Sequence, residues 1–368
     1  MKILRVISRI ITGAVFVFSG TVKAIDPLGS TYKFSDYFTA FGLDFMQPLC
    51  LPLAFLLCLA EFITGFSLLT GIKYKAGVMG ATVLMSIFTP LTLILAITNP
   101  VSDCGCFGDA IKLTNWQTFW KNVVLMTLVI ILIFDKNKPL EYIRSLPGWL
   151  VIFSVSIIFM GFTGYNLKYL PIIDFLPYKK GNNIKELMEI PEGAPAPVYK
   201  TTFIYEKNGI RKEFTLDNFP ADDTTWKFID QKSVLVKKGY EPPIHGFSLV
   251  TADNRDITDM VLNNSNFTLL MISPKLEKAK PERLNKGFQT GHKCMTYGID
   301  FYILTASSSD KIKDYDSNLQ FCLVDEITLK TMVRSNPGYI MLRNGTITGK
   351  WSWANLPEDI ENLIKTNN

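Results

Sequence analysis

The sequence predicts an α-helical transmembrane bundle followed by a C-terminal α/β domain that is exposed to water. Long apolar runs with few charges fill about the first 170 residues, and Lys, Asp, Glu, Asn and Thr become frequent after them. Short apolar segments then alternate with segments of helical pattern, which is typical of a sheet covered by helices. The 368 residues are enough for two domains of ordinary size.

Five apolar segments are long enough to span a membrane as helices. Each has roughly 19 to 23 residues, which matches a hydrocarbon core of about 30 Å at 1.5 Å per residue. The segments cover residues 3–24, 48–69, 76–98, 116–134 and 146–167. The first segment begins with basic residues, as a signal peptide does. Because it lacks a small-residue cleavage pattern and four spans follow it, we expect it to remain as a helix.

Basic residues in the short loops predict the orientation. The loops on one side carry Lys2, Arg5, Lys73, Lys75, Lys136, Lys138 and Arg144. The loops on the other side carry Lys23, Lys33 and Lys112. Because loops rich in Lys and Arg face the cytoplasm, we expect a multi-pass protein of the cytoplasmic (inner) membrane with its N-terminus inside. The C-terminal domain and the loop between the third and fourth spans are then extracytoplasmic, in a periplasmic compartment.

The loop between the third and fourth spans contains the most informative motif, Cys104-Gly105-Cys106. Two thiols at this spacing lie close enough to bridge, and the glycine between them permits unusual backbone dihedrals. A bridge over so short a loop restricts the unfolded chain little and is strained. Strained, exposed disulfides exchange readily. The motif therefore indicates thiol–disulfide exchange and names Cys104 and Cys106 as candidate catalytic residues.

Other interpretations of this motif stay open. The pair can be a permanent structural disulfide, two idle thiols, or part of a metal site with Asp103 and Asp109. A closed zinc site takes four ligands, and the only two histidines of the chain lie far away in sequence. We therefore predict no metal. The net charge of +5 comes without a basic stripe that is interleaved with aromatic residues, so we expect the lipid bilayer and no nucleic acid as a partner.

Two residues of the second span are further candidates. Glu61 lies in the middle of this span, where an unpaired charged carboxylate costs several kcal/mol. It should face the bundle, either as a proton relay or small-molecule contact or as a helix-to-helix hydrogen bond. Its candidate partners are Lys23, Arg9, Asn122 and Lys121. Cys50, near the outer end of the span, is a candidate relay thiol, although free cysteines are also common packing residues.

Residues 1–140 resemble the DoxX/MauE family of integral membrane proteins. The resemblance rests on Phe-Val-Phe-Ser-Gly-Thr-Val-Lys at 16–23, Asp-Pro at 26–27, Ala-Glu-Phe at 60–62, Cys-Gly-Cys-Phe-Gly at 104–108 and Trp116. It implies a four-helix membrane domain linked to thiol redox and, in the methylamine-utilisation branch, to disulfide maturation of a periplasmic enzyme. In layout the region also resembles four-helix thiol oxidoreductases that use quinone, which implies quinone as a candidate cofactor. Those enzymes carry Cys-x-x-Cys, which this region lacks.

The rest of the chain divides by composition. Residues 141–167 form the fifth transmembrane helix, 168–200 a linker rich in Pro and Gly, 201–242 a small β-rich lead-in and 243–368 the outer domain. In the lead-in we expect strands at 202–205 and 214–216 around an Asn208-Gly209 turn. In the outer domain we expect strands at 267–272, 301–305, 321–324, 339–343 and 347–351. The expected helices of this domain cover 281–297, 326–333 and 357–365.

Residues 243–368 resemble the thioredoxin fold. The order of elements carries the resemblance, together with Asn336-Pro337-Gly338-Tyr339, which is similar to the cis-proline site of that family. Where the family places Cys-x-x-Cys, this chain has Ser-Pro-Lys-Leu at 273–276. The redox activity of the family therefore does not carry over. The resemblance implies a docking module with Asn336 and Pro337 as candidate docking residues, and we expect Cys294 and Cys322 to be core residues.

Two functions remain. The first is extracytoplasmic thiol–disulfide redox, or disulfide maturation of a partner, with thiols or disulfides of extracytoplasmic proteins as substrates. The alternative is a non-enzymatic, membrane-anchored scaffold or assembly factor whose thioredoxin-like domain docks a partner. A transporter is disfavoured because the sequence shows no internal repeat.

Overall fold

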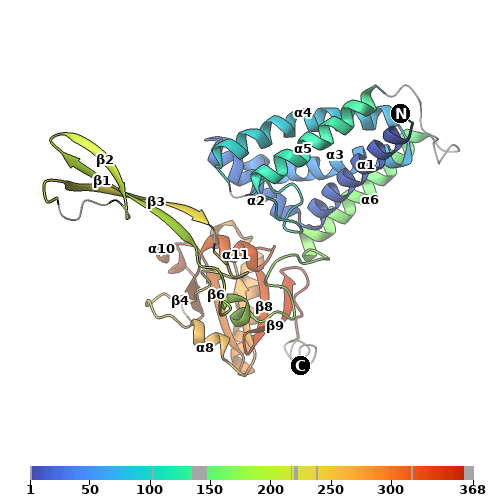
Figure 1. The fold of residues 1–368 in the computed structure, drawn as a ribbon. Helices are drawn as coiled ribbons and strands as arrows, with labels where there is room; N and C mark the ends of the chain where they lie inside the picture. The colour runs from blue at the N-terminus through green and yellow to red at the C-terminus, as the bar shows by residue number, and fades with distance from the viewer. Residues whose placement is uncertain are drawn as a thin grey trace. The chain divides into compact units, whose positions relative to one another are not determined.

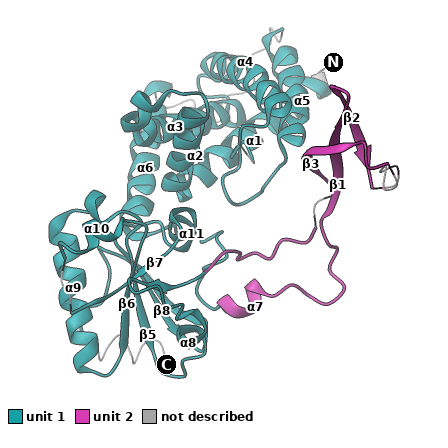
Figure 2. Cartoon of the chain, turned by 90° about the vertical axis from the view of Figure 1, so that its left-hand side faces the viewer, with its two compact units in different colours: residues 1–182, 248–368 teal, residues 183–247 magenta. Residues whose placement is uncertain are grey.

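The computed structural model describes residues 2–101, 103–134, 147–216, 218, 223–237, 239–315 and 318–359. It divides into two compact units (Figure 2). One unit contains residues 1–182 and 248–368, and the other contains residues 183–247.

Five helices of the first unit are long and apolar enough to cross a membrane. They are α1 (Lys2–Ile25), α3 (Cys50–Thr70), α4 (Tyr74–Thr98), α5 (Asn115–Ile133) and α6 (Gly148–Tyr169). The five predicted spans are confirmed, each within two residues at either end. The helices lie side by side (Figure 1), and large apolar side chains such as Leu56, Met79 and Ile97 remain exposed on them, as a lipid environment requires.

The sequence analysis missed a sixth helix in this region, α2 (Pro27–Ala40), which is followed by the short η1 (Asp44–Leu49). Asp26 caps α2 by accepting a hydrogen bond from the Gly29 amide, and Pro27 occupies its first turn, where proline is favoured. The helix mixes polar and apolar residues and is too short to span a bilayer. Hydropathy therefore gives no signal for it.

Glycines let α1 and α3 approach closely. A Cβ atom added to Gly65 would lie 2.5 Å from the Gly13 carbonyl oxygen and 2.6 Å from the Val17 nitrogen. A Cβ added to Gly20 would lie 2.7 Å from the Cys58 carbonyl oxygen. Small residues at such crossings allow backbone contact between helices in membranes, where no hydrophobic effect drives association.

The C-terminal part of the first unit is built on a six-stranded mixed sheet in the order β4-β7-β6-β5-β8-β9. The strands are β4 (Val250–Thr251), β5 (Thr268–Ile272), β6 (Asp300–Thr305), β7 (Gln320–Leu323), β8 (Gly338–Arg343) and β9 (Thr346–Ser352). β5, β6 and β7 are parallel, whereas β8, β9 and β4 pair antiparallel with their neighbours. All five residues of β5 are buried, as expected for a central strand that is covered on both faces.

Helices connect and cover these strands. They are α8 (Thr258–Leu262), η2 (Leu276–Lys278), α9 (Pro281–Thr296), α10 (Ser309–Ile312) and α11 (Glu326–Met332). The five predicted strands and the helices at 281–297 and 326–333 are confirmed. Cys294 and Cys322 are fully buried, as expected. Of the predicted closing helix, residues 357–359 are not helical and the remainder lies outside the described residues.

The second unit is a three-stranded antiparallel sheet preceded by the short α7 (Ile184–Met188). Its strands are β1 (Val198–Lys207), β2 (Ile210–Thr215) and β3 (Lys227–Lys237), in the order β2-β1-β3. Asn208 and Gly209 both have positive φ, so the predicted tight turn is confirmed. The sequence analysis missed β3, every residue of which is exposed. A strand with two exposed faces lacks the alternation that marks a half-buried strand.

Replacing Gly65 by valine should force α1 and α3 apart, because the new side chain meets backbone rather than flexible atoms. We expect a loss of about 1–3 kcal/mol of stability, measured as a lower unfolding temperature of the detergent-solubilised chain. Gly161→Val on α6 is the matched control, because no atom lies within 4 Å of a Cβ at that position. Equal unfolding temperatures for the two variants would contradict the close packing.

Candidate functional site

The Cys-Gly-Cys loop connects α4 to α5. Cys104 and Cys106 are both free and partly buried, and their sulfur atoms lie 2.9 Å apart. Gly105 between them has a φ of 65°, and a Cβ at this position would lie 2.9 Å from Cγ of Lys33. Only glycine meets both constraints, so Gly105 allows the two thiols to face each other.

Helix α2 holds the first half of this loop. The Lys33 ammonium group donates to Asp103 Oδ2 at 2.8 Å, and the other oxygen of Asp103 accepts from the Gly105 amide at 2.9 Å. The Tyr37 hydroxyl donates to the Cys104 carbonyl oxygen at 2.6 Å. Lys33 and Tyr37 are four residues apart and share one face of α2, so this single helix positions the two residues that precede Gly105.

Helices α1 and α3 hold the second half through a buried ion pair. The Lys23 ammonium group lies 2.8 and 3.0 Å from the two carboxylate oxygens of Glu61, and only 5% of Lys23 and 4% of Glu61 is exposed. Lys23 also donates to Ser19 Oγ at 2.7 Å and to the Cys106 carbonyl oxygen at 2.6 Å. Ser19 Oγ donates to the same carbonyl oxygen at 2.8 Å. The pair therefore connects two membrane helices directly to the dithiol loop.

Of the four candidate partners of Glu61, the structure selects Lys23. Asn122 donates to Thr92 Oγ1 at 3.1 Å instead. The Lys121 ammonium group lies 4.5 Å from the centre of the Phe107 ring. Glu61 faces the bundle interior, as the cost of a charge in lipid predicts.

The two thiols differ strongly in acidity. The hydrogen bond between the two sulfur atoms lowers the pKa of Cys106 against the effect of burial, and together with the positive charges of Lys121 and Lys23 it brings this pKa to about 6. The same hydrogen bond and burial raise the pKa of Cys104. At neutral pH Cys106 is therefore the thiolate and Cys104 is the thiol. A thiol with a lowered pKa beside a second thiol is typical of reactive dithiols.

A cavity of about 100 Å³ opens beside the dithiol. Its lining contains the dithiol and polar side chains from the surrounding helices: Cys104, Cys106, Ser19, Lys23, Ser30, Lys33, Tyr37, Glu61, Lys121 and Asn122. The apolar remainder comes from α1, α2, α3, α4 and α5, and its side chains are Val15, Phe16, Phe34, Leu57, Met85, Phe88, Leu91 and Leu125. The site thus combines thiols, charged groups and an apolar surface.

The second-span cysteines lie apart from this cavity. Cys50, at the start of α3, is buried with its sulfur 3.6 Å from Gln47 Oε1, and it does not line the cavity. Cys58 is buried beside Ala24 and Phe159. Within the described ranges, no three His, Cys, Asp or Glu side chains gather in a metal-ligand arrangement.

The candidate docking residues lie in the C-terminal part of the first unit. The peptide bond between Asn336 and Pro337 is cis. The Ser273 hydroxyl donates to Asn336 Oδ1 at 2.7 Å, and the Asn336 amide group donates to the Lys275 carbonyl oxygen at 3.1 Å. Asn336 therefore contacts the Ser-Pro-Lys segment that follows β5.

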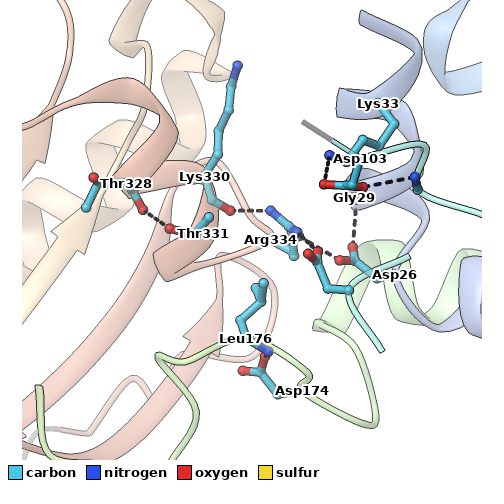
Figure 3. Close-up of polar contacts among 12 residues, drawn as sticks. Asp26, Gly29, Lys33, Asp103, Asp174, Leu176, Thr328, Lys330, Thr331 and Arg334 are labelled. Atoms are coloured by element: carbon cyan, nitrogen blue, oxygen red, sulfur yellow. Dashed lines mark hydrogen bonds and ion pairs between the residues drawn. The ribbon is translucent and has the colours of Figure 1, made fainter. Parts of the chain in front are cut away.

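The sequence analysis missed three residues that hold the loop: Lys33, Tyr37 and Arg334. Arg334 donates from Nε to Asp26 Oδ2 at 2.8 Å (Figure 3) and from Nη2 to Asp109 Oδ2 at 2.7 Å. The i,i+4 spacing of Lys33 and Tyr37 is a signal that a search for a helix face could have used. No local pattern connects Arg334 to carboxylates that lie 308 and 225 residues earlier.

Comparison with known proteins supports part of this description. Residues 1–135 match the family described as methylamine utilisation protein MauE. Residues 199–238 match a domain of unknown function (DUF8463). No curated protein and no solved structure matches the chain. The N-terminal region is thus similar to a MauE-type membrane protein, in agreement with its apolar helices.

Replacing Lys23 by methionine should leave Glu61 buried without its cation. Breaking a buried ion pair in this way costs about 3–5 kcal/mol, whereas an apolar pair of similar volume is often neutral. We therefore expect Lys23→Met to lower the unfolding temperature of the solubilised chain and Lys23→Met with Glu61→Leu to restore part of it. If the double variant unfolds at a lower temperature than Lys23→Met, the pair does not act as a unit.

Proposed function

We propose that this MauE-like membrane protein is a thiol–disulfide oxidoreductase, and that its Cys104–Cys106 pair accepts electrons from thiols of extracytoplasmic proteins. The observation that carries the proposal is the pair itself: two sulfur atoms 2.9 Å apart, one of which has a pKa lowered to about 6. A low thiol pKa stabilises the reduced form of a pair and so makes its disulfide form oxidising.

The exchange proceeds in two balanced steps. A thiolate of the partner attacks Cys104 of the oxidised pair, the Cys104–Cys106 bond breaks, and Cys106 leaves as a thiolate because the thiol of lower pKa leaves faster. A second partner thiolate then attacks the partner sulfur of the mixed disulfide and releases Cys104. The partner gains a disulfide and loses two electrons. The Cys104–Cys106 pair gains these electrons. Of the two protons that the partner thiols lose, one converts Cys104 to its thiol and the other passes to water, because Cys106 stays a thiolate.

The reduced pair then needs an acceptor of two electrons, for which we propose a membrane quinone. Support for this comes from the cavity lining, which combines apolar side chains with Lys121 and both cysteines. A bound quinone would supply a two-electron, two-proton acceptor that is soluble in lipid. The chain contributes an apolar site next to both sulfurs, with charged groups in its lining.

Proton transfer at this site is assigned to Glu61 with Lys23. Glu61 contacts Lys23, and Lys23 contacts the Cys106 carbonyl oxygen, so the pair reaches from α3 to the dithiol loop. We propose that Glu61 serves as the proton relay. Cys50 is left out of this proposal because it does not line the cavity.

We propose that the C-terminal region is thioredoxin-like and serves to dock partners. Supporting observations are the strand order β7-β6-β5-β8-β9, the parallel β5–α9–β6 unit and the contact between Asn336 and the segment after β5. The placement of this region and of the dithiol loop outside the inner membrane rests on the larger number of Lys and Arg residues in the opposite loops.

The test compares the thiol state of extracytoplasmic proteins in cells that carry the wild-type chain and the Cys104→Ser/Cys106→Ser variant. We expect a membrane-impermeant thiol reagent to label more partner thiols in the variant, because these thiols are no longer oxidised. The reagent should also reach the reduced pair from the outer side. Cys294→Ala, a core change far from the loop in sequence, is the control and should match the wild type.

Two outcomes separate the alternatives. An unchanged thiol pattern together with intact biological activity of the double-Ser variant would favour the non-enzymatic scaffold. In quinone-depleted membranes the wild-type pair should accumulate in its reduced form. A pair that stays oxidised there would remove quinone from the proposal and leave the exchange itself untouched.

A further inference from the structure

Arg334 joins the C-terminal region to the membrane region of the same unit. The residue follows α11 and is only 5% exposed. Its Nε and Nη2 donate to Asp26 and Asp109, and Nη1 donates to the Lys330 carbonyl oxygen. Every nitrogen of the guanidinium group therefore has an acceptor. Two of the three acceptors are carboxylates of the membrane region, and Figure 3 shows the contact with Asp26.

Both carboxylates belong to segments that position the dithiol. Asp109 lies three residues after Cys106 in the same loop. Asp26 uses its second oxygen to cap α2 at the Gly29 amide. Because α2 carries the side chains that hold Asp103 and Cys104, Arg334 acts on the loop from two directions.

We propose that Arg334 is a positioning residue of the dithiol site, through which the C-terminal region fixes the Cys-Gly-Cys loop and sets the reactivity of Cys106. The inference rests on the proposed exchange chemistry and adds a role for a region that has Ser273 where a thioredoxin would carry its first cysteine. This region contributes no thiol to the site. It contributes a guanidinium group that contacts one carboxylate in the loop and one at the start of α2.

The chain contains a matched control for this role. Lys350 on β9 contacts Asp174 Oδ2 at 2.5 Å and the Tyr178 carbonyl oxygen at 3.0 Å, so it also joins the sheet to the membrane region through the segment after α6. Its burial is similar, with side-chain exposures of 8% for Lys350 and 22% for Asp174, against 6% for Arg334 and 22% for Asp109. Both hydrogen bonds of Lys350 that the described residues show go to the segment after α6, whereas those of Arg334 reach the cap of α2 and the dithiol loop.

The experiment measures alkylation of the reduced, full-length chain by iodoacetamide as a function of pH, and mass spectrometry identifies the modified cysteine. Only the thiolate reacts, so the rate for Cys106 should rise with pH around a midpoint near 6 in the wild type. In Arg334→Gln the midpoint should rise by about one pH unit or more, toward the ordinary thiol value of about 8.5. Below the midpoint this shift makes alkylation about tenfold slower.

Further variants separate positioning from general destabilisation. Lys350→Gln should keep the wild-type midpoint, and Arg334→Lys should lie between the wild type and Arg334→Gln. Asp109→Asn loses the Arg334–Asp109 ion pair but keeps the Arg334–Asp26 pair and the Asp26 cap of α2, so it serves even where Arg334→Gln does not fold. It should also raise the midpoint.

An unchanged midpoint in Asp109→Asn and Arg334→Gln, or an equal shift in Lys350→Gln, would overturn the inference. Alkylation needs no partner protein. Failure of the proposed exchange would therefore appear in the thiols of partners while the midpoint still shifts, and the two failures are distinguishable.

Discussion

The end of the bundle that carries the dithiol loop depends on one buried charge, the ammonium group of Lys23. A cation in a membrane helix must find an anion and further acceptors, because lipid offers neither. Glu61 supplies the anion, and Ser19 and the Cys106 carbonyl oxygen supply the remaining acceptors. The contacts that Lys23 needs therefore fix the register of α1 against α3. They also fix the position of the dithiol loop at the end of these helices.

This pair forms only because the two helices approach closely. Lys23 and Glu61 lie near glycines of the α1–α3 contact, and a side chain at Gly20 would collide with the Cys58 carbonyl oxygen. The ion pair therefore depends on the close packing of α1 against α3. The loop needs a third support, which α2 and Arg334 provide from outside the spanning helices.

The sequence predicted the features that depend on local composition. The five spans follow from apolar length, the Asn208-Gly209 turn from its residue type, and the strands around α9 from their apolar runs. Helix α2 and strand β3 escaped prediction because neither has an apolar pattern: α2 mixes polar and apolar residues, and β3 is exposed throughout and is held by pairing with β1. For the site, hydropathy showed that Glu61 needs a partner but left four candidates.

Long-range ion pairs account for the rest of the site. Arg334 reaches Asp26 and Asp109 across more than 200 residues of sequence, and no motif marks such a contact. Asp109 was noted only as a flanking acid of the Cys-Gly-Cys motif, where a metal ligand was one interpretation. In the structure its partner is a guanidinium group. Ion pairs between residues so far apart in sequence can be identified only from the three-dimensional structure.

The equilibrium reduction potential of the Cys104–Cys106 pair tests the central proposal most directly. It can be measured by thiol trapping of membranes that are poised in glutathione buffers. An exchangeable couple should give a potential near the glutathione range, about −180 to −260 mV. A pair that resists reduction to below about −300 mV would be a structural disulfide and would contradict a role in exchange.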